Sequence, residues 1–208
     1  MKRLFDIVVA SVMLLCFSPV LLVAMVLVRL KMGAPILFHQ LRPGLHGEIF
    51  QMVKLRTMLD AKDADGNPLP DAQRMTKLGS ILRSSSIDEF PALWNVIKGD
   101  MSLVGPRPLM VRYLPRYNER QARRHEVKPG ITGWAQVNGR NAVEWEKRFE
   151  LDVWYVENQS FWLDIKILFL TAGKVIRRDG ISAPGEATMT EFMGSPASGN
   201  ADAPEATP

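Results

Sequence analysis

The longest apolar segment of the chain lies near its N-terminus, where no charged residue occurs from Ile7 to Val28. These 22 positions correspond to about 33 Å of straight helix, which matches the ~30 Å hydrocarbon core of a bilayer. The segment is therefore predicted to be a membrane helix. A cleaved signal peptide fits less well, because Arg29 and Lys31 follow where a small-residue cleavage site is expected.

Ser18 and Pro19 interrupt this segment at its centre. Proline removes a backbone hydrogen bond and clashes with the preceding turn, so each half is long enough for only half a bilayer. The positive-inside rule gives no direction, because basic residues flank both ends: Lys2, Arg3, Arg29 and Lys31. A re-entrant helix that leaves on the side it entered and a kinked spanning helix both remain open.

The pattern after this segment indicates a compact mixed domain. Residues 35–40 and 49–58 read as strands joined through turn residues. On the second strand, the two-residue period places Lys54 and Arg56 on one face, where they could hold a phosphate or simply face solvent. Residues 60–74 are polar and contain Gly66, and they are predicted to form a loop or a hairpin tip.

Helical periods dominate the second half of the chain, at residues 109–127, 142–158 and 160–178. The last of these places Trp and Phe opposite Lys and Arg, which suits a helix lying in a membrane interface. A helix that faces the protein core remains the other interpretation. Small, polar and proline residues follow from about 185, where a flexible acidic tail is expected.

Charge is distributed unevenly along the chain. It has 26 Lys and Arg against 22 Asp and Glu, a net charge of +4, and residues 185–208 hold four of the acids and none of the cations. The remaining 26 cations and 18 acids give residues 1–184 a net charge of +8. Such a body prefers an anionic partner: nucleic acid, an anionic membrane face or a phosphorylated small molecule. Cys16, the single cysteine, excludes a disulfide framework or a thiolate metal cluster.

Candidate chemistry is concentrated in residues 83–108. Pro91 predicts the first turn of a helix, with Asp88 at or near its N-cap and Glu89 in the first turn. These acids could simply complement the helix dipole. They could also take separate roles, one as a nucleophile while the other holds Mg²⁺ or steers a proton. The two prolines around Arg107 could pre-position it as a bidentate phosphate ligand, or form a rigid turn.

Residues 129–141 form a second candidate stretch, rich in glycine and amide side chains and containing Trp134. Such a loop can wrap a sugar or a nucleotide, with amides for hydroxyls and the indole for stacking. By composition alone it could equally consist of structural turns.

These motifs occur together and in a fixed order: KRLFD at 2–6, the Ser18-Pro19 break, RPG at 42–44, KLRTM at 54–58, SSIDEFPALWNV at 85–96, KGDMSLVGPRP at 98–108 and KPGITGWAQVNGRN at 128–141. In this combination the chain resembles the small monotopic phosphoglycosyl transferases of bacteria, from about residue 2 to about residue 190. GISAPGEATM at 180–189 is similar to the ending of the bacillosaminyl-phosphate transferases of protein glycosylation. Larger relatives, with extra membrane helices, start capsule or O-antigen polymers with other sugars.

The resemblance implies transfer of a phospho-sugar from a UDP-sugar to undecaprenyl phosphate, with release of UMP, at the cytoplasmic face of the bacterial inner membrane. Asp88 would attack the β-phosphate to form a covalent phosphosugar-aspartate, and Mg²⁺ would be held by Asp88 and Glu89. Lys54 and Arg107 would neutralise the diphosphate. Arg56 and Arg140 are further candidates for phosphate or uridine contacts, and Asp164 is expected to have a structural or positioning role.

The resemblance also sets the expected organisation. The fold class is mixed α/β, mostly α with a small sheet, in a monotopic membrane protein. Residues 1–34 would form a re-entrant helix bent at Ser18-Pro19, residues 35–184 a cytoplasmic catalytic domain with interfacial helices, and residues 185–208 the acidic tail. Enzymes of the same glycan pathway are possible partners.

The expected donor is UDP-N,N′-diacetylbacillosamine. The alternative is the same reaction with another UDP-hexose or UDP-N-acetylhexosamine for capsule, exopolysaccharide or O-antigen. A membrane-tethered nucleic-acid binder would explain the basic body but has no recognition motif to support it. A non-catalytic membrane adaptor would leave Asp88, Arg107 and residues 129–141 without a role.

Overall fold

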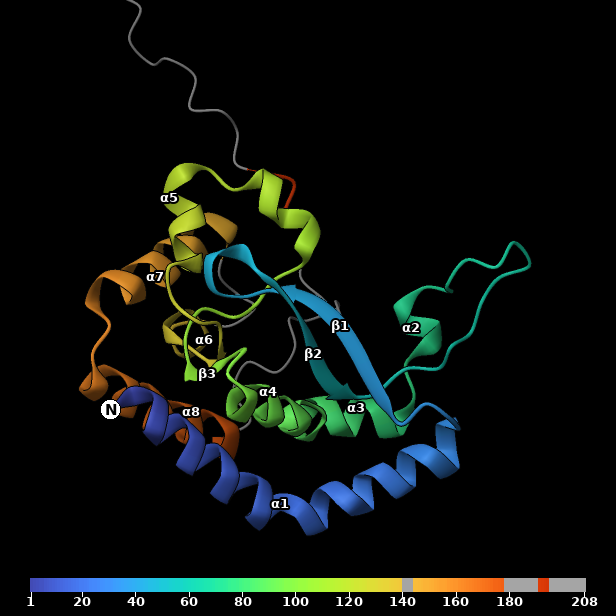
Figure 1. Ribbon diagram of the computed structural model, residues 1–208. Coiled ribbons are helices and arrows are strands. Elements are labelled where there is room, and N and C mark those ends of the chain that lie inside the picture. The colour runs from blue at the N-terminus through green and yellow to red at the C-terminus, as the bar shows by residue number, and fades with distance from the viewer. Residues whose placement is uncertain (140–143, 178–190, 195–208) are drawn as a thin grey trace, which may run out of the picture.

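The computed structural model describes residues 1–139, 144–177 and 191–194. Its first element is α1 (Lys2–Met32), a helix of 31 residues that contains Pro19. The helix bends near its middle (Figure 1), as expected where a proline removes a backbone hydrogen bond. Ser18 Oγ donates to the carbonyl of Leu15 at 2.8 Å. By length and composition, α1 is apolar enough to cross a membrane, and most of its surface is exposed.

Two strands follow as an antiparallel pair, β1 (Leu37–Pro43) and β2 (Ile49–Leu55), joined through a short 3₁₀ turn at Leu45–Gly47. The two predicted strands do pair with each other, but their bounds differ from the predicted ones. The first strand runs three residues further than predicted, and the second ends before Arg56. The register pairs Leu37 with Leu55, and one further backbone bond follows, from the amide of Arg56 to the carbonyl of Ile36 at 2.9 Å. The ladder ends there, at the preceding residue Pro35, which has no N–H to donate.

The remaining elements are mostly helical: α2 (Asp71–Arg74), α3 (Lys77–Ser84), η2 (Ile87–Ala92), α4 (Leu93–Lys98), η3 (Val111–Arg116), α5 (Glu119–Ala122), η4 (Arg123–His125), α6 (Trp134–Val137), α7 (Trp145–Asn158) and α8 (Phe161–Arg177). The last two match the helices predicted at 142–158 and 160–178. The stretch at 109–127, predicted to be helical on either side of Pro115, consists of three short helical segments; Pro115 lies inside the first, and the Asn118 cap begins the second.

A second, parallel strand pair joins two distant parts of the chain, β3 (Ser102–Val104) and β4 (Gly130–Thr132). The backbones pass very close at its end, since a Cβ atom on Gly130 would lie 2.1 Å from the amide nitrogen of Gly105. This contact places residues 105–108 directly beside residues 129–133. The two small sheets and the many helices confirm a mixed fold that is mostly α.

The predicted hairpin tip at 60–74 is also confirmed. Lys62 and Pro68 form an antiparallel bridge, and the backbone amides of Asp65 and Asn67 donate to the carboxylate of Asp63. The hairpin projects from the body beside α2 (Figure 1).

The main core gathers the N-terminal half of α1, β2, α4, β3, α7 and α8. Its most buried side chains include Ala10, Val96, Met101, Tyr155 and Ile167. The charged residues of the KRLFD motif attach α1 to this core: Lys2 Nζ pairs with Asp164, and Ser102 Oγ donates to Asp6 at 2.8 Å. Asp164, for which the resemblance implied a structural or positioning role, is 2% exposed and also accepts a hydrogen bond from Tyr155 Oη at 2.6 Å.

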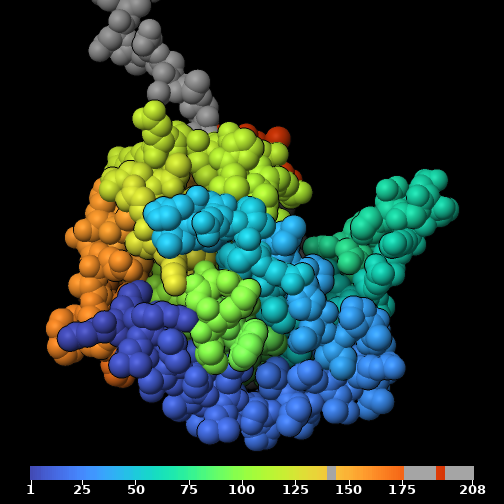
Figure 2. Space-filling view, viewed as in Figure 1, coloured from blue at the N-terminus to red at the C-terminus, as the bar shows by residue number. Residues whose placement is uncertain are grey.

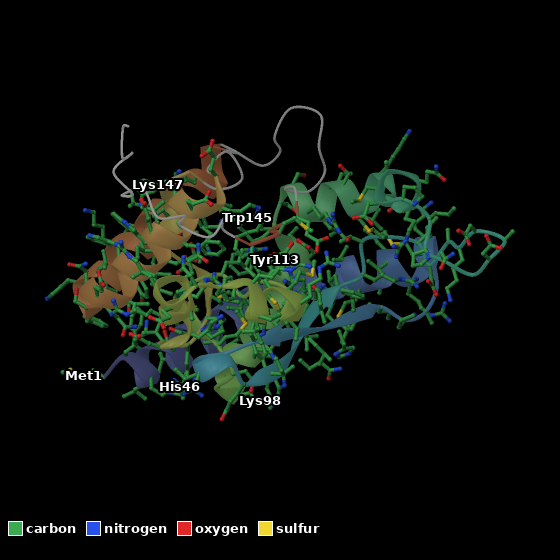
Figure 3. All side chains as sticks on the ribbon, turned by 90° about the horizontal axis from the view of Figure 1, so that it is seen from above. Met1, His46, Lys98, Tyr113, Trp145 and Lys147 are labelled. Carbon is green, nitrogen blue, oxygen red and sulfur yellow. The ribbon has the colours of Figure 1, made fainter. Side chains whose placement is uncertain are left out.

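Part of the predicted tail packs against the body. Phe192 is 2% exposed and lies against Tyr113, Phe149 and Trp145. Figure 3 labels Tyr113 and Trp145, whose ring centroids lie 5.7 Å apart. The apolar Phe192 within an otherwise polar segment explains the difference, so residues 191–194 belong to the folded body.

Large apolar side chains remain exposed on two helices. On α8, Trp162 is 77% and Phe169 76% exposed, while Ile167 on the other side of the helix is fully buried. On α1, exposed Leu and Val side chains run along the whole length of the helix. Helix α1 forms one continuous edge of the molecule (Figure 2).

Candidate active site

Asp88 and Glu89 lie in η2, a 3₁₀ helix that connects α3 to α4. Glu89 lies in the first helical turn, as predicted, whereas Pro91 lies inside η2 rather than in its first turn. Ser86, in the left-handed conformation at φ 57°, turns the chain after α3, so that helical winding begins at Ile87 and α4 itself begins only at Leu93. Asp88 is therefore inside the first turn of η2 rather than its N-cap. Successive residues of a 3₁₀ helix diverge by about 120°, so the two carboxylates point in different directions.

The carboxylate of Glu89 is held by two cations from distant parts of the chain. Lys54 Nζ of β2 donates to Oε1 at 2.8 Å. Arg107 donates through both terminal nitrogens, from Nη1 to Oε2 at 3.2 Å and from Nη2 to Oε1. Burial alone would raise the pKa of Glu89, but Arg107 and Lys54 outweigh it and hold that pKa well below its usual range. Glu89 is therefore a permanent anion at physiological pH.

The carboxylate of Asp88 has the opposite surroundings. It is 8% exposed, and none of the residues that the structure describes donates a hydrogen bond or forms an ion pair with it. Burial, followed by the charge of Glu89, raises the pKa of Asp88 to about 6. Neighbouring Lys54 and Arg107 limit the rise. Asp88 is thus still ionised at neutral pH, and its oxygens are available to a ligand or a reaction partner.

The backbone carbonyl of Arg107 is held by Arg124, which itself forms a buried ion pair with Asp152. Arg124 Nη2 donates to the Arg107 carbonyl at 2.7 Å and to Asp152 of α7 at 2.7 Å. The Arg124 and Asp152 side chains are 1% and 2% exposed. The sequence interpretation missed both residues, because a charged run at 119–126 looks like a solvated helix until its tertiary partners are known.

Arg83 and Arg42 are two further cations that act on the η2 acids and were not among the predicted site residues. Arg83 of α3 donates to Thr57 Oγ1 at 3.1 Å, and its charge lowers the pKa of Asp88. Arg42 of β1 interacts electrostatically with Glu89 and Arg107. The available signal was their position, since Arg42 begins the RPG motif at 42–44 and Arg83 lies two residues before the SSIDEFPALWNV motif at 85–96.

Arg56 is held elsewhere. Its guanidinium donates to the carbonyls of Ala34 at 2.9 Å, Gly33 at 2.8 Å and Met32. These carbonyls lie at and just beyond the C-terminal end of α1, where a cation complements the helix dipole. Arg56 was expected to share a face with Lys54 and to contact phosphate or uridine, but here it anchors the end of α1. Arg140 lies outside the described residues.

Among residues 1–139, 144–177 and 191–194, no group of three or more His, Cys, Asp or Glu side chains could enclose a metal ion. A divalent cation at this site would depend on the two carboxylates of η2. The oxygens of Asp88 accept no hydrogen bond from the described chain, and Glu89 Oε2 accepts one, from Arg107. Each carboxylate therefore keeps free lone pairs for a cation that takes its other ligands from water or a substrate.

Comparison with known proteins gives a consistent result. The family model described as bacterial sugar transferase matches residues 1–178. An uncharacterized sugar transferase of Bacillus subtilis is 59% identical over 195 residues, which cover 94% of this chain and 96% of that protein.

Two relatives with named substrates also match. The UDP-glucose:undecaprenyl-phosphate glucose-1-phosphate transferase of Caulobacter vibrioides is 41% identical over 190 residues, 86% of this chain and 70% of that protein. The undecaprenyl-phosphate galactose phosphotransferase of Salmonella typhimurium is 39% identical over 197 residues, 86% of this chain but 41% of that protein. The chain therefore spans less than half the length of the Salmonella enzyme.

Proposed function

The chain belongs to the bacterial sugar transferase family, and we propose that it moves a sugar 1-phosphate from a UDP-sugar to undecaprenyl phosphate with release of UMP. One observation of this structure carries the proposal. A buried, ionisable and unpaired Asp88 lies beside a carboxylate that two cations keep charged. Such a combination suits a nucleophile that attacks an anionic phosphate within a positively charged site.

The named relatives favour one of the two donor alternatives. The Caulobacter enzyme is named for UDP-glucose and the Salmonella enzyme for galactose. We therefore place a UDP-hexose or UDP-N-acetylhexosamine donor, for an exopolysaccharide, capsule or O-antigen, ahead of UDP-N,N′-diacetylbacillosamine. The expected assignment to protein glycosylation has no support among these relatives.

The proposed reaction has two steps. An oxygen of the Asp88 carboxylate attacks the β-phosphorus of the donor, and the bond from that phosphorus to the bridging oxygen breaks, so that UMP leaves. The product is a phosphosugar-aspartate. An oxygen of undecaprenyl phosphate then attacks the same phosphorus and releases Asp88 as a free carboxylate. The absence of any hydrogen bond from the described residues to Asp88 supports this role, since donors would weaken the nucleophile.

The cations next to Glu89 have a separate role in this proposal. Arg107 offers a planar fork that matches phosphate oxygens, and Lys54 adds a point charge. Glu89 holds both side chains in place before the donor arrives, so little reorganisation is needed. Asp88 and Glu89 would hold Mg²⁺, which when bound would neutralise part of the negative charge of the diphosphate.

The membrane arrangement is also a proposal. Both ends of α1 attach to the same domain, the N-terminal end through Lys2 and Asp6 and the C-terminal end through Arg56. The bend lies near the middle of α1 (Figure 1), where Phe17 packs against Phe90 of η2 with ring centroids 4.8 Å apart, so both halves of the helix stay on the same domain. These contacts support a re-entrant helix that enters and leaves on the cytoplasmic face of the inner membrane, with the exposed aromatic side chains of α8 in the interface.

The experiment measures UMP release by the purified full chain with Mg²⁺, undecaprenyl phosphate and a panel of UDP-sugars. Asp88→Asn is compared with Asp65→Asn, which changes an exposed acid of the hairpin. We expect release with one donor, retained in the hairpin variant and lost in Asp88→Asn. A donor labelled in the β-phosphate should also leave label on the wild-type protein when the acceptor is omitted. Full activity of Asp88→Asn would refute the covalent route, and no release with any donor would favour a non-catalytic adaptor.

A further inference from the structure

The inner face of the β1–β2 pair carries a cation that the proposed chemistry has not used. In the strand register, Arg42 lies opposite Phe50, Gln40 opposite Met52 and Phe38 opposite Lys54. Alternate residues of a strand share a face, so Arg42 and Lys54 project from the same side of the pair. The four-residue offset between Phe50 and Lys54 separates the two positions by about 13 Å along the strand.

The guanidinium of Arg42 lacks an acidic partner. Its Nη2 donates to Gln40 Oε1 at 2.7 Å, and its Nε is buried without a hydrogen-bond partner. No carboxylate within the described ranges forms an ion pair with it. Burial, followed by repulsion from Arg107, lowers the pKa of Arg42 to about 10. Glu89 partly opposes this effect, but its two oxygens are already bound by Lys54 and Arg107.

Other arginines near the site have more partners, although Nε of Arg56 is also buried without one. Arg107 forms an ion pair with Glu89, and Arg124 forms one with Asp152. Arg56 donates hydrogen bonds to three carbonyl oxygens. A partly buried cation with an orphaned N–H costs folding free energy and is retained where a ligand compensates it. The compensating ligand must be an anion, and a phosphate offers several acceptor oxygens to the guanidinium fork.

We propose that Arg42 binds a phosphate group of a substrate, and that it extends the phosphate-binding face formed by Arg107 and Lys54. This inference rests on the proposed function and adds a residue to its binding site. The phosphate could belong to the diphosphate of the donor or to the lipid acceptor, since both present the same oxyanion. This proposal gives a function to Arg42, the first residue of the RPG motif.

The first test uses inorganic pyrophosphate as the probe and thermal unfolding of the full chain in detergent as the readout. We expect pyrophosphate to raise the Tm of the wild type and of Arg120→Met, an exposed control on α5, and to raise the Tm of Arg42→Met clearly less, because only Arg107 and Lys54 remain to bind it. Without pyrophosphate, the Tm of Arg42→Met should equal or exceed that of the wild type, because an uncompensated charge is removed. A wild-type response to pyrophosphate in Arg42→Met would overturn the proposal, as would a lower ligand-free Tm with unchanged kinetics.

The second test distinguishes the two sources of phosphate. UMP release is measured first with the UDP-sugar concentration varied at saturating undecaprenyl phosphate, and then with the undecaprenyl phosphate concentration varied at saturating UDP-sugar. We expect Arg42→Met to raise one of the two KM values by about 10- to 100-fold, as for the loss of hydrogen bonds to a charged group, and Arg42→Lys to restore part of it. A rise for the UDP-sugar assigns Arg42 to the donor, and a rise for undecaprenyl phosphate assigns it to the acceptor. Unchanged KM values for both substrates would overturn the proposal.

The two tests also separate this inference from the proposed function. If the wild type releases no UMP, the proposed function fails, while the pyrophosphate response still decides whether Arg42 binds phosphate. If the wild type is active and Arg42→Met matches it in both tests, only the inference about Arg42 fails.

Discussion

Asp88 and Glu89 are adjacent in the chain, but their surroundings give them different proton affinities. Glu89 accepts from Lys54 and Arg107, whereas Asp88 faces burial and the neighbouring negative charge without a hydrogen-bond donor from the described residues. The pKa of Asp88 rises to about 6 and the pKa of Glu89 falls. Two identical functional groups therefore acquire different properties, which suit the roles proposed for them: Asp88 as the nucleophile and Glu89 as a fixed negative charge.

This difference predicts the acidic side of the pH profile. Asp88 must be ionised to attack, so kcat/KM for the donor should rise as pH increases, with a midpoint at about 6. Removing a nearby cation should move that midpoint upward, since Arg83 and Lys54 both lower the pKa of Asp88. The midpoint is measured from initial rates of UMP release between pH 5 and 8, for the wild type and for Arg83→Gln. A flat profile across that range would contradict an ionising Asp88 in the rate-determining chemistry.

The same pKa predicts a trade-off between stability and activity. A carboxyl whose pKa rises from 3.8 to about 6 on folding costs the native state roughly 3 kcal/mol once it is ionised in both states. This cost is complete above about pH 6 and disappears below about pH 4, where the group is protonated in both states. Asp88→Asn should therefore be inactive but more stable than the wild type at pH 8, with no such gain at pH 4. Denaturant unfolding in detergent at the two pH values checks the sign.

The elements differ in how far the sequence determines them. Helices α1, α7 and α8 could be predicted because each has an apolar period longer than three turns, and the hairpin at 60–74 follows from its turn residues. The start of η2 could not, because Ser86 adopts a left-handed conformation that no local signal required. The partners of Arg56 and Arg124 could not be predicted either, since each depends on a segment more than 20 residues away. The central acids were found because the motif around them is specific.

The contact between β3 and β4 positions the Arg107 turn, and it depends on glycine. A Cβ atom on Gly105 would lie 2.2 Å from the carbonyl oxygen of Lys128, which belongs to the backbone and cannot move aside. Gly105→Ala should therefore displace the turn, lower stability by about 1–3 kcal/mol as overpacking does, and reduce UMP release through a misplaced Arg107.

Gly173 of α8 provides the matched control, because a Cβ atom there would meet nothing within 4 Å. Gly173→Ala should raise stability by about 0.5–1 kcal/mol, the usual gain for alanine inside a helix, with activity unchanged. Denaturant unfolding curves give the stability of Gly105→Ala and Gly173→Ala, and UMP release gives their activity, each compared with the wild type. Equal stability of Gly105→Ala and wild type would show that the close approach of β3 and β4 is dispensable.

At the scale of the whole molecule, α1 is attached to the rest of the chain at both ends and packs on it through one side of each half. Lys2 and Asp6 attach one end to α8 and β3, and Arg56, which directly follows β2, binds the carbonyl groups at the other end. The apolar side chains between these ends are mostly exposed. In the proposed membrane arrangement the acceptor phosphate would lie at the headgroup level, and a domain attached to both halves of a re-entrant helix would keep Asp88 at a constant depth.

This arrangement predicts the topology of the two chain ends. With epitope tags at the N- and C-termini of the full chain, both tags should be protected from protease in intact spheroplasts and cleaved after permeabilisation. Without the bend, the 31 residues of α1 form about 46 Å of helix, which exceeds the ~30 Å hydrocarbon core. Pro19→Ala should therefore expose the N-terminal tag in part of the population and lower UMP release in proportion. Pro68→Ala, in the exposed hairpin, should change neither. Cleavage of the wild-type N-terminal tag in intact spheroplasts, with the C-terminal tag protected, would instead establish a spanning helix and remove the basis for a domain held at both ends of α1.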